Sequence, residues 1–495
     1  MVKMIVYTLL FTSILCFAHA STLLKPPQTA LVIGFEKVYD LSLLANTLSD
    51  QGIDATLIVP SIYSNDVYEN LINVEVIKLN FTIEKNLKNE DKALKACEVF
   101  LSDKKIHQTV IEIAPTFTIF PAVRHDACLI PWTLNIDSIP VIWADGYEEE
   151  LYVIHNSKMA IPIYTSGVIE RFWSHLNMKT EIANIEGNYV FPAIKITQRY
   201  LSHASRNLLD EWYSDVKLFL WGSDPVVRLN FAPLTHRLVE IGCHHCRGVQ
   251  PLPPALQKDL VEFRLGTIVV TLEDNHFELI TKIAERLPQG RQGQAVAWKT
   301  RASAKKKPEN LFLHQNVDRQ DLIGYVRARA FLSHCSDIEL LEAAFHGTPI
   351  LCFPRNTQET KNALRAVELG FSVLLNDDYS IDNVYKAIEE LSQVSSYREF
   401  AKKISLALRD RIVPASDKIN FWLSYTARNK ETAVNYWPVG KGITIRTFDE
   451  DVKFFYGLLI GIIFGALFTI TTVLTWYYQR KESKMNKMKG KKHTR

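Results

Sequence analysis

The stretch AFLSHCSDIELLEAAFHGTPILCFP, residues 330–354, decides the fold because its pattern changes from strand to helix and back to strand. Residues 330–333 form an apolar run typical of a buried strand, and Asp337 is a predicted helix N-cap. Apolar residues then recur at helical spacing until Gly347, where the helix is expected to end. The apolar run 349–354 supplies the next strand. This pattern predicts a βαβ unit whose polar residues lie at the carboxyl edge of a parallel sheet, where ligands bind.

The composition is that of a large globular protein with an apolar segment at each end. The chain has 495 residues, 47% hydrophobic and 22% charged, which suits two domains and excludes collagen-like, disordered and disulfide-dense classes. Residues 1–20 combine Lys3, an apolar core and the ending Ala18-His19-Ala20, typical of a cleaved secretory signal. Residues 454–478 carry no charge and are long enough to span a bilayer.

The charges around the apolar run predict its orientation. Acidic residues 449–451 precede it and the strongly basic segment 479–495 follows it, so the tail is expected in the cytosol. Because the excess of positive charge belongs to this tail, the body of the chain is net acidic and no nucleic-acid partner is expected. A lumenal body also fits Asn80, which heads the only N-glycosylation sequon of the chain.

The polar residues of the opening stretch carry a family resemblance. His334 precedes the helix, Glu342 follows eight positions later, and His346-Gly347 with Pro349 comes after it. This pattern resembles the donor-binding signature of the membrane-bound UDP-glycosyltransferases, the glucuronosyltransferase group. The run GCHHCRGVQPLPPAL, residues 242–256, is similar to the segment by which the first domain of that family passes to the second.

The resemblance implies an α/β fold with two Rossmann-like domains of GT-B type facing across a cleft, plus one C-terminal transmembrane helix. The expected organisation is a signal peptide (1–20), an N-terminal acceptor-binding domain (21–245), a linker (246–265), a C-terminal UDP-sugar-binding domain (266–435), a juxtamembrane segment (436–453), the transmembrane helix (454–478) and a basic cytosolic tail (479–495). Apolar periodicity independently predicts strands at 31–34, 56–60, 74–77, 109–113, 139–143, 267–272, 295–298, 311–313 and 330–333.

The implied activity is transfer of glucuronic acid or a hexose from a UDP-sugar to a small lipophilic hydroxyl compound in the endoplasmic reticulum. The UDP-sugar is a co-substrate, and no further cofactor is expected. By resemblance, His334 at a helix start would contact the diphosphate and Glu342 would accept the ribose hydroxyls. Gln358 and Glu359 replace the family's sugar-binding aspartate-glutamine pair, and Ser336 with Cys335 replaces two phosphate-binding glycines.

The catalytic base of the family is a histidine in the loop after the first strand. The corresponding position here is Lys37, and residues 35–40 contain no histidine. A lysine is protonated near neutral pH unless burial lowers its pKa, so Lys37 is a poor substitute. Glu112, Ala114 and Asp126 all fit the rough spacing of the acid that orients the base, and the sequence does not choose among them.

Other departures from the family pattern keep alternatives open. Residues 316–319, Asn-Val-Asp-Arg, stand where the family holds uracil, and Glu273-Asp274 would bring two acids near the diphosphate. A second hypothesis is therefore a catalytically inactive binding or partner subunit. A third is a divergent enzyme whose base is supplied differently. Gly457, Gly461 and Gly465 form overlapping GxxxG patterns that would suit a homo- or hetero-dimer.

Six cysteines remain after the signal segment, too few for a disulfide framework, although one or two bridges would suit an oxidising compartment. The sequence Cys243-His244-His245-Cys246 resembles a metal-binding motif. A structural zinc site needs a second ligand pair at comparable spacing, and none follows. We therefore expect no metal.

Overall fold

The computed structural model describes residues 28–80, 89–121, 125–144, 183–205, 216–227, 238–302, 306–375, 378–429 and 443–490, with a few helical positions between 173 and 180. The predicted signal peptide lies outside this part of the chain. The chain forms two compact units, of which the first holds both sheets and the second holds the C-terminal helix.

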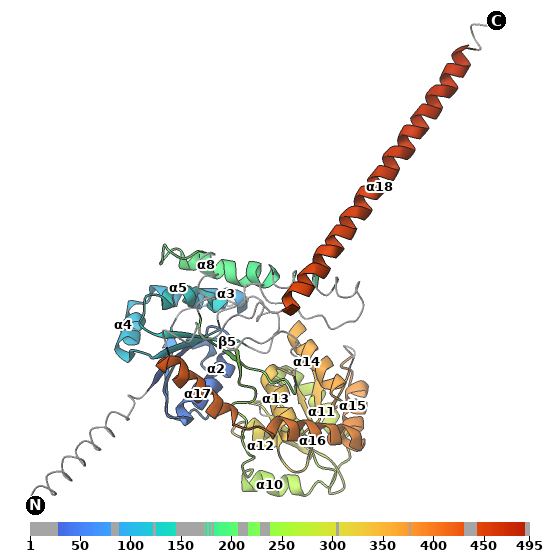
Figure 1. Ribbon diagram of the computed structural model, residues 1–495. Coiled ribbons are helices and arrows are strands. Elements are labelled where there is room, and N and C mark those ends of the chain that lie inside the picture. Colours follow the sequence, from blue (N-terminus) through green and yellow to red (C-terminus); the bar gives the residue numbers. More distant parts are fainter. Residues whose placement is uncertain are drawn as a thin grey trace, which may run out of the picture. The chain divides into compact units, whose positions relative to one another are not determined.

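The first lobe is built on a parallel sheet in the order β3-β2-β1-β4-β5-β6-β7 (Figure 1). Its strands are β1 (Thr29–Ile33), β2 (Asp54–Pro60), β3 (Val74–Leu79), β4 (Phe117–Phe120), β5 (Ile139–Ala144), β6 (Leu218–Trp221) and β7 (Leu238–Glu240). Its described helices include α2 (Val38–Asp50), α3 (Asn89–Ser102), α4 (Lys104–Ile113), α5 (Leu129–Thr133) and α8 (Phe191–Thr197). This is the strand order of a Rossmann fold, in which ligands bind where the order reverses, here between β1 and β4.

The strand predicted at 109–113 is wrong, because these residues belong to helix α4. The β-branched run favoured a strand, but Asp103 caps the helix by accepting hydrogen bonds from the backbone N–H groups of Lys105 and Ile106. Ile106 and Val110 are buried on one face, whereas Ile111 is exposed. The helical period of burial therefore outweighed the strand propensity of the individual residues.

The second lobe repeats the same strand order in the sheet β10-β9-β8-β11-β12-β13, also fully parallel. Its strands are β8 (Thr267–Val270), β9 (Ala295–Lys299), β10 (Leu311–His314), β11 (Ala328–Ser333), β12 (Ile350–Cys352) and β13 (Ser372–Val373). Its helices are α10 (Pro254–Val261), α11 (Phe277–Arg286), α12 (Arg319–Ile323), α13 (Asp337–His346), α14 (Thr357–Glu368), α15 (Ile381–Gln393) and α16 (Ser395–Arg409).

Both faces of the second sheet are buried, as expected for a parallel sheet. Val269 and Phe331 belong to one apolar core, and their neighbours Ile268, Val270 and Leu332 belong to the core on the opposite face. The βαβ unit predicted from residues 330–354 is confirmed as β11, α13 and β12. The helix starts one residue earlier than predicted, because Ser336 is the N-cap and Asp337 is the first helical residue.

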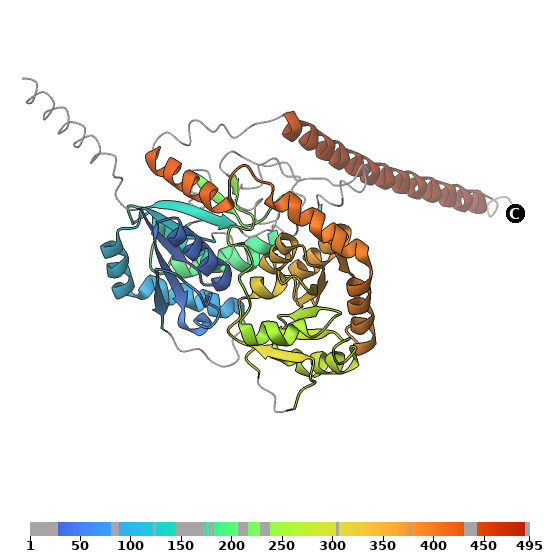
Figure 2. The same ribbon diagram turned by 90° about the horizontal axis from the view of Figure 1, so that it is seen from below.

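Helix α17 (Ala415–Arg428) follows the second lobe in sequence but packs in the core of the first. Ile419 and Leu423 are fully buried there, and Figure 2 shows α17 beside the strands and helices of the first lobe. The chain therefore crosses between the lobes twice, once before α10 and once after α16.

The C-terminal helix α18 (Ile443–Gly490) forms the main part of the second unit. Its segment Tyr456–Met485 has a mean hydropathy of 2.3 and is long and apolar enough to cross a membrane. Gly457, Gly461 and Gly465 all lie within this segment.

Candidate functional site

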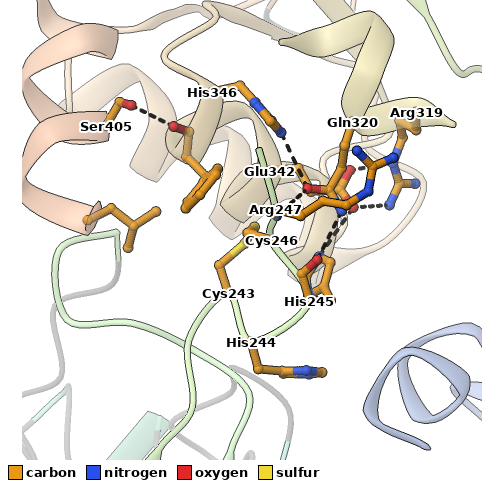
Figure 3. The surroundings of a disulfide bond; sticks show 12 residues. Cys243, His244, His245, Cys246, Arg247, Arg319, Gln320, Glu342, His346 and Ser405 are labelled. Carbon is orange, nitrogen blue, oxygen red and sulfur yellow. Dashed lines mark hydrogen bonds and ion pairs between the residues drawn. A yellow bond between two sulfur atoms is a disulfide. The ribbon is translucent and has the colours of Figure 1, made fainter. Parts of the chain in front are cut away.

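Glu342 lies in the middle of α13 and is almost completely buried, with 1% of its side chain exposed. Its Oε2 and Oε1 accept hydrogen bonds from Nε and Nη2 of Arg319, at 2.5 and 2.9 Å. The Nε2 atom of His245, in the segment between the lobes, lies 3.2 Å from Oε1 (Figure 3). The carboxylate thus has a bidentate cation and an imidazole as partners within the protein.

These partners keep Glu342 ionised despite its burial. Burial alone would raise the pKa of the carboxyl, but Arg319 and the hydrogen bond from His245 outweigh it and lower the pKa to about 2. In the described structure, Arg319 occupies the oxygen atoms that the family resemblance assigned to ribose hydroxyls. A nucleotide could use Glu342 only after this ion pair separates.

The N-terminus of α13 is occupied by a carboxylate of the same helix. Ser336 and Glu339 form a capping box, in which Glu339 Oε2 accepts the Ser336 backbone N–H at 3.1 Å. Thr271 donates its hydroxyl to the other oxygen, at 3.0 Å. A helix N-terminus favours an anion, and here a side chain supplies it. Ser336, which was predicted to replace a phosphate-binding glycine, is therefore the N-cap of α13.

His334 is a buried residue that directly follows β11 and lies three residues before the first residue of α13. Its Nδ1–H donates to the carbonyl oxygen of Phe353 at 2.8 Å. Its Nε2 is buried and has no hydrogen-bond partner among the described residues. A neutral imidazole with this tautomer cannot donate to a phosphate from Nε2, so a diphosphate contact would require the protonated form.

The two predicted sugar-binding residues are also engaged. Gln358 donates to Asp337 Oδ2 at 2.7 Å, and Glu359 accepts hydrogen bonds from Arg355 at 2.7 Å through both the backbone and Nη2. Arg355 also pairs with Glu273, which balances part of the negative charge predicted near the diphosphate. The structure therefore brings the predicted donor residues to one sheet edge but gives each of them an internal partner.

Three disulfide bonds, more than the one or two considered from the sequence, connect Cys97 with Cys128, Cys243 with Cys246, and Cys335 with Cys352. Cys335 replaces the first of the two glycines and has φ 60°, a left-handed conformation that glycine adopts readily. The backbone thus keeps a glycine-like conformation at this position. Its side chain is tied to the end of β12.

Contacts between the lobes close the space around Glu342. Tyr68 of the first lobe donates to Asp318 at 2.9 Å, and the guanidinium of Arg319 lies 5.2 Å from the ring centroid of Tyr39. Burial, together with Asp318, raises the pKa of Tyr68 to about 12. A small pocket beside His245 is lined by both lobes and has a volume of ≈ 10 Å³, room for little more than one water molecule.

Comparison with known proteins identifies the family. The model of the family described as UDP-glucoronosyl and UDP-glucosyl transferase matches residues 10–487. The chain belongs to the UDP-glycosyltransferase family. It is 24% identical over 462 residues to UDP-glucosyltransferase 2 of Dactylopius coccus, covering 84% of this chain and 88% of that protein. It is 26% identical to UDP-glucuronosyltransferase 1A8 of Rattus norvegicus over 61% of this chain and 56% of that protein.

Solved glycosyltransferases share the bilobal GT-B fold of this family member. A UDP-glucosyltransferase from Polygonum tinctorium, described as capable of glucosylating indoxyl, aligns with a TM-score of 0.54 at 13% identity, covering 81% of this chain and 99% of that one. The glycosyltransferase of kitacinnamycin aligns with a TM-score of 0.52 at 16% identity, covering 81% and 100%. The predicted fold is confirmed by these similarities and by the two parallel sheets.

In this UDP-glycosyltransferase, Lys37 is the half-buried residue that precedes α2, with φ 54°. The three candidates for the acid that orients the base differ in burial and in their contacts. Glu112 is exposed on α4, and Ala114 ends that helix. Asp126 is buried, and its Oδ1 accepts the backbone N–H of Phe35 at 2.8 Å. Asp126 is therefore the candidate that touches the loop after β1.

His244, in the segment between the lobes, is a residue to which the sequence predictions assign no role. His244 lines the small cavity together with Asp40, Trp143 and Asp337. It lies 2.9 Å from the Thr47 hydroxyl of α2, whereas His245 contacts Glu342. Figure 3 shows both histidines on the turn, and their ring centroids lie 5.3 Å apart in an edge contact. The adjacent histidines in the motif were a signal, but only the fold shows that they face different lobes.

The same motif contains three potential metal ligands. Ligand atoms of Cys243, His245 and Cys246 lie within 4.8 Å of one another, a spacing compatible with an ion. The two sulfur atoms, however, form a disulfide, which leaves only the imidazole as a ligand. The expectation that the chain binds no metal stays a prediction.

Asn80 follows β3 directly and is exposed. An exposed asparagine is accessible to glycosylation, which stays a prediction. Phe81 and Thr82, the rest of the sequon, lie outside the described residues.

Proposed function

We propose that this chain is a membrane-anchored UDP-glycosyltransferase that transfers glucuronic acid or a hexose from a UDP-sugar to a small lipophilic hydroxyl compound. The observation that carries the proposal is the family match along residues 10–487, which includes both lobes and the apolar helix. Named relatives include a UDP-glucosyltransferase and a UDP-glucuronosyltransferase, which is why both sugars are proposed.

The proposed location is the endoplasmic reticulum membrane, with the lobes in the lumen and the basic tail in the cytosol. The apolar segment Tyr456–Met485 supports a single span. The basic residues that follow it support the orientation. Three disulfides suit an oxidising lumen.

Binding of a UDP-sugar beside α13 would require the lobes to separate, because the small pocket there, ≈ 10 Å³, cannot contain a nucleotide. Opening would break the Tyr68–Asp318 hydrogen bond and the contact between Lys299 and Glu69 across the lobes. Arg319 must also leave Glu342. Domain opening and closing of this kind accompanies catalysis in many bilobal enzymes.

A second candidate is a catalytically inactive binding or partner subunit. The specific observation in its favour is the buried pair of Arg319 with Glu342, which occupies the proposed ribose contact. The Glu339 carboxylate at the start of α13 also opposes diphosphate binding. Under this hypothesis, these contacts stabilise a closed form, and α18 would provide pairing with a second chain.

One experiment separates the two candidates. The full-length chain in detergent is incubated with a panel of UDP-sugars and mixed phenolic acceptors, while UDP release and thermal stability are measured. The enzyme proposal predicts saturable UDP release that depends on both sugar donor and acceptor. Stabilisation by UDP-sugars without turnover would support the binding subunit. Absence of both signals with every donor would refute the enzyme proposal.

A further inference from the structure

We propose that His244, in the segment between the lobes, is the general base that replaces the histidine missing from the loop after β1. This inference rests on the proposed function, because it assigns a residue to the same sugar-transfer site. Transfer with an attacking hydroxyl requires a group that accepts its proton. Lys37, at the position expected from the family, is a poor base near neutral pH.

The hydrogen bonds around His244 fix which nitrogen carries the proton. Thr47 donates its single hydroxyl proton to the carbonyl oxygen of Leu43 at 2.9 Å. Its oxygen can therefore only accept from His244, whose Nδ1 lies at 2.9 Å. The imidazole is thus the Nδ1–H tautomer, and Nε2 keeps its lone pair. This is the arrangement of an oriented general base, in which a neighbouring group sets the tautomer.

The electrostatic surroundings keep the ring neutral. Burial, reinforced by the neighbouring His245, holds the pKa of the His244 imidazole well below its usual range. Among the described residues, Nε2 has no hydrogen-bond partner, and the residue as a whole is half-buried. The neutral imidazole, with the lone pair on Nε2, is the form that a general base requires before it takes a proton.

The position of His244 suits both substrates. In the small cavity it lies with Asp337, Ile338 and Leu341 of α13, the helix whose start would face a diphosphate. It also lines a second, open pocket of ≈ 400 Å³, whose walls combine Ile241 and Phe345 with the charged side chains of Asp224, Glu240, Arg409, Arg411 and Lys418. That volume is in the range of small-molecule sites. His244 therefore borders both the donor helix and a space large enough for a small acceptor.

The proposed step balances without a further reagent. As Nε2 takes the hydroxyl proton, the acceptor oxygen forms a bond to the anomeric carbon of the sugar. The bond from that carbon to the diphosphate oxygen breaks, and its electron pair leaves with UDP. The His244 imidazolium then returns its proton to solvent when the product leaves.

The test compares His244→Asn with wild type in full-length chain, because asparagine can still donate to Thr47 but cannot act as a base. A general base typically contributes 10²–10⁴-fold, so kcat should fall about 100-fold or more while KM changes little. Activity of wild type should fall as pH drops through the depressed pKa of His244, and this acid limb should disappear in the variant. His203→Asn, a change of an exposed histidine in the first lobe, is the matched control.

A second readout does not depend on turnover. Diethyl pyrocarbonate reacts with neutral, accessible imidazoles, so mass spectrometry should find His244 modified and protected by UDP together with an acceptor. If wild type turns over and His244→Asn stays within about threefold of it, the assignment fails while the proposed function stands, because the expected loss is far larger. If wild type shows no turnover with any donor, both fail.

Discussion

Arg319 is predicted to be the main internal competitor of the nucleotide, and its removal should increase UDP affinity. The change is Arg319→Met, which removes the charge but keeps an apolar stem beside Tyr39. In wild type, both Glu342 oxygens accept from this guanidinium at 2.5 and 2.9 Å, and 1% of the Glu342 side chain is exposed. Ribose hydroxyls must therefore replace a buried bidentate pair.

The magnitude follows from the cost of separating such a pair. Removing one partner of a buried ion pair costs about 3–5 kcal/mol. Wild type would have to spend this free energy whenever UDP displaces Arg319, whereas the variant has already lost the pair. At about 1.4 kcal/mol per factor of ten, UDP should bind roughly 100- to 4,000-fold more tightly to Arg319→Met. The variant should also be less stable without UDP, because Glu342 then keeps only His245 as a partner.

The assay is calorimetric titration of UDP into the full-length chain in detergent, with thermal unfolding as a second measurement. Arg301→Met is the matched control, since Arg301 also reaches the first lobe, at the carbonyl oxygen of Asn65, but does not contact Glu342. Adding Glu342→Gln to Arg319→Met should abolish most of the gain. The reasoning is refuted if folded Arg319→Met binds UDP no more tightly than wild type, or if Arg301→Met gives the same gain.

Three further predictions concern stability. Burial lowers the pKa of His346 from 6.5 to about 4, so the unfolded chain binds a proton more readily than the folded chain. The free energy of unfolding should therefore fall by about 3 kcal/mol as the pH drops from 6.5 to 4. Urea unfolding of His346→Asn should not show this loss. Leu423→Ala, at a fully buried position, should lower the free energy of unfolding of the first lobe by about 2–5 kcal/mol. Phe421→Ala, at an exposed position of the same helix, should change that free energy little, and unfolding monitored by tryptophan fluorescence measures both. Ser336→Ala removes a cap and should cost about 1 kcal/mol in the same assay, and an unchanged midpoint would contradict the capping box.

The fold could be predicted largely because burial is periodic in the sequence. Residues 330–354 contain a strand, a helix and a strand in sequence order, and β11, α13 and β12 lie where this pattern indicates. The prediction failed at 109–113, where β-branched residues lie on an amphipathic helix with Asp103 as its cap. Strand propensity takes each residue by itself, whereas the structure depends on the burial of Ile106 and Val110 together on one face of the helix.

The chemistry of the site could not be predicted to the same extent, because it depends on partners that are distant in sequence. The sequence indicates Glu342, but its two partners lie at positions 319 and 245, on another helix and in the segment between the lobes. No local pattern relates these positions. The same holds for Asp126, whose contact with Phe35 joins segments 91 residues apart and distinguishes it from Glu112.

The histidine pair at positions 244 and 245 connects these observations. His245 contacts Glu342 of the second lobe, and His244 contacts Thr47 of the first, so one short turn reaches the proposed donor residue and the helix after the family's base loop. The disulfide between Cys243 and Cys246 constrains this turn at both ends. A base on the segment between the lobes would be positioned by both of them, and its alignment with the sugar would depend on closure. Loss of the histidine after β1 is therefore compatible with catalysis, provided that Arg319 releases Glu342 when UDP binds.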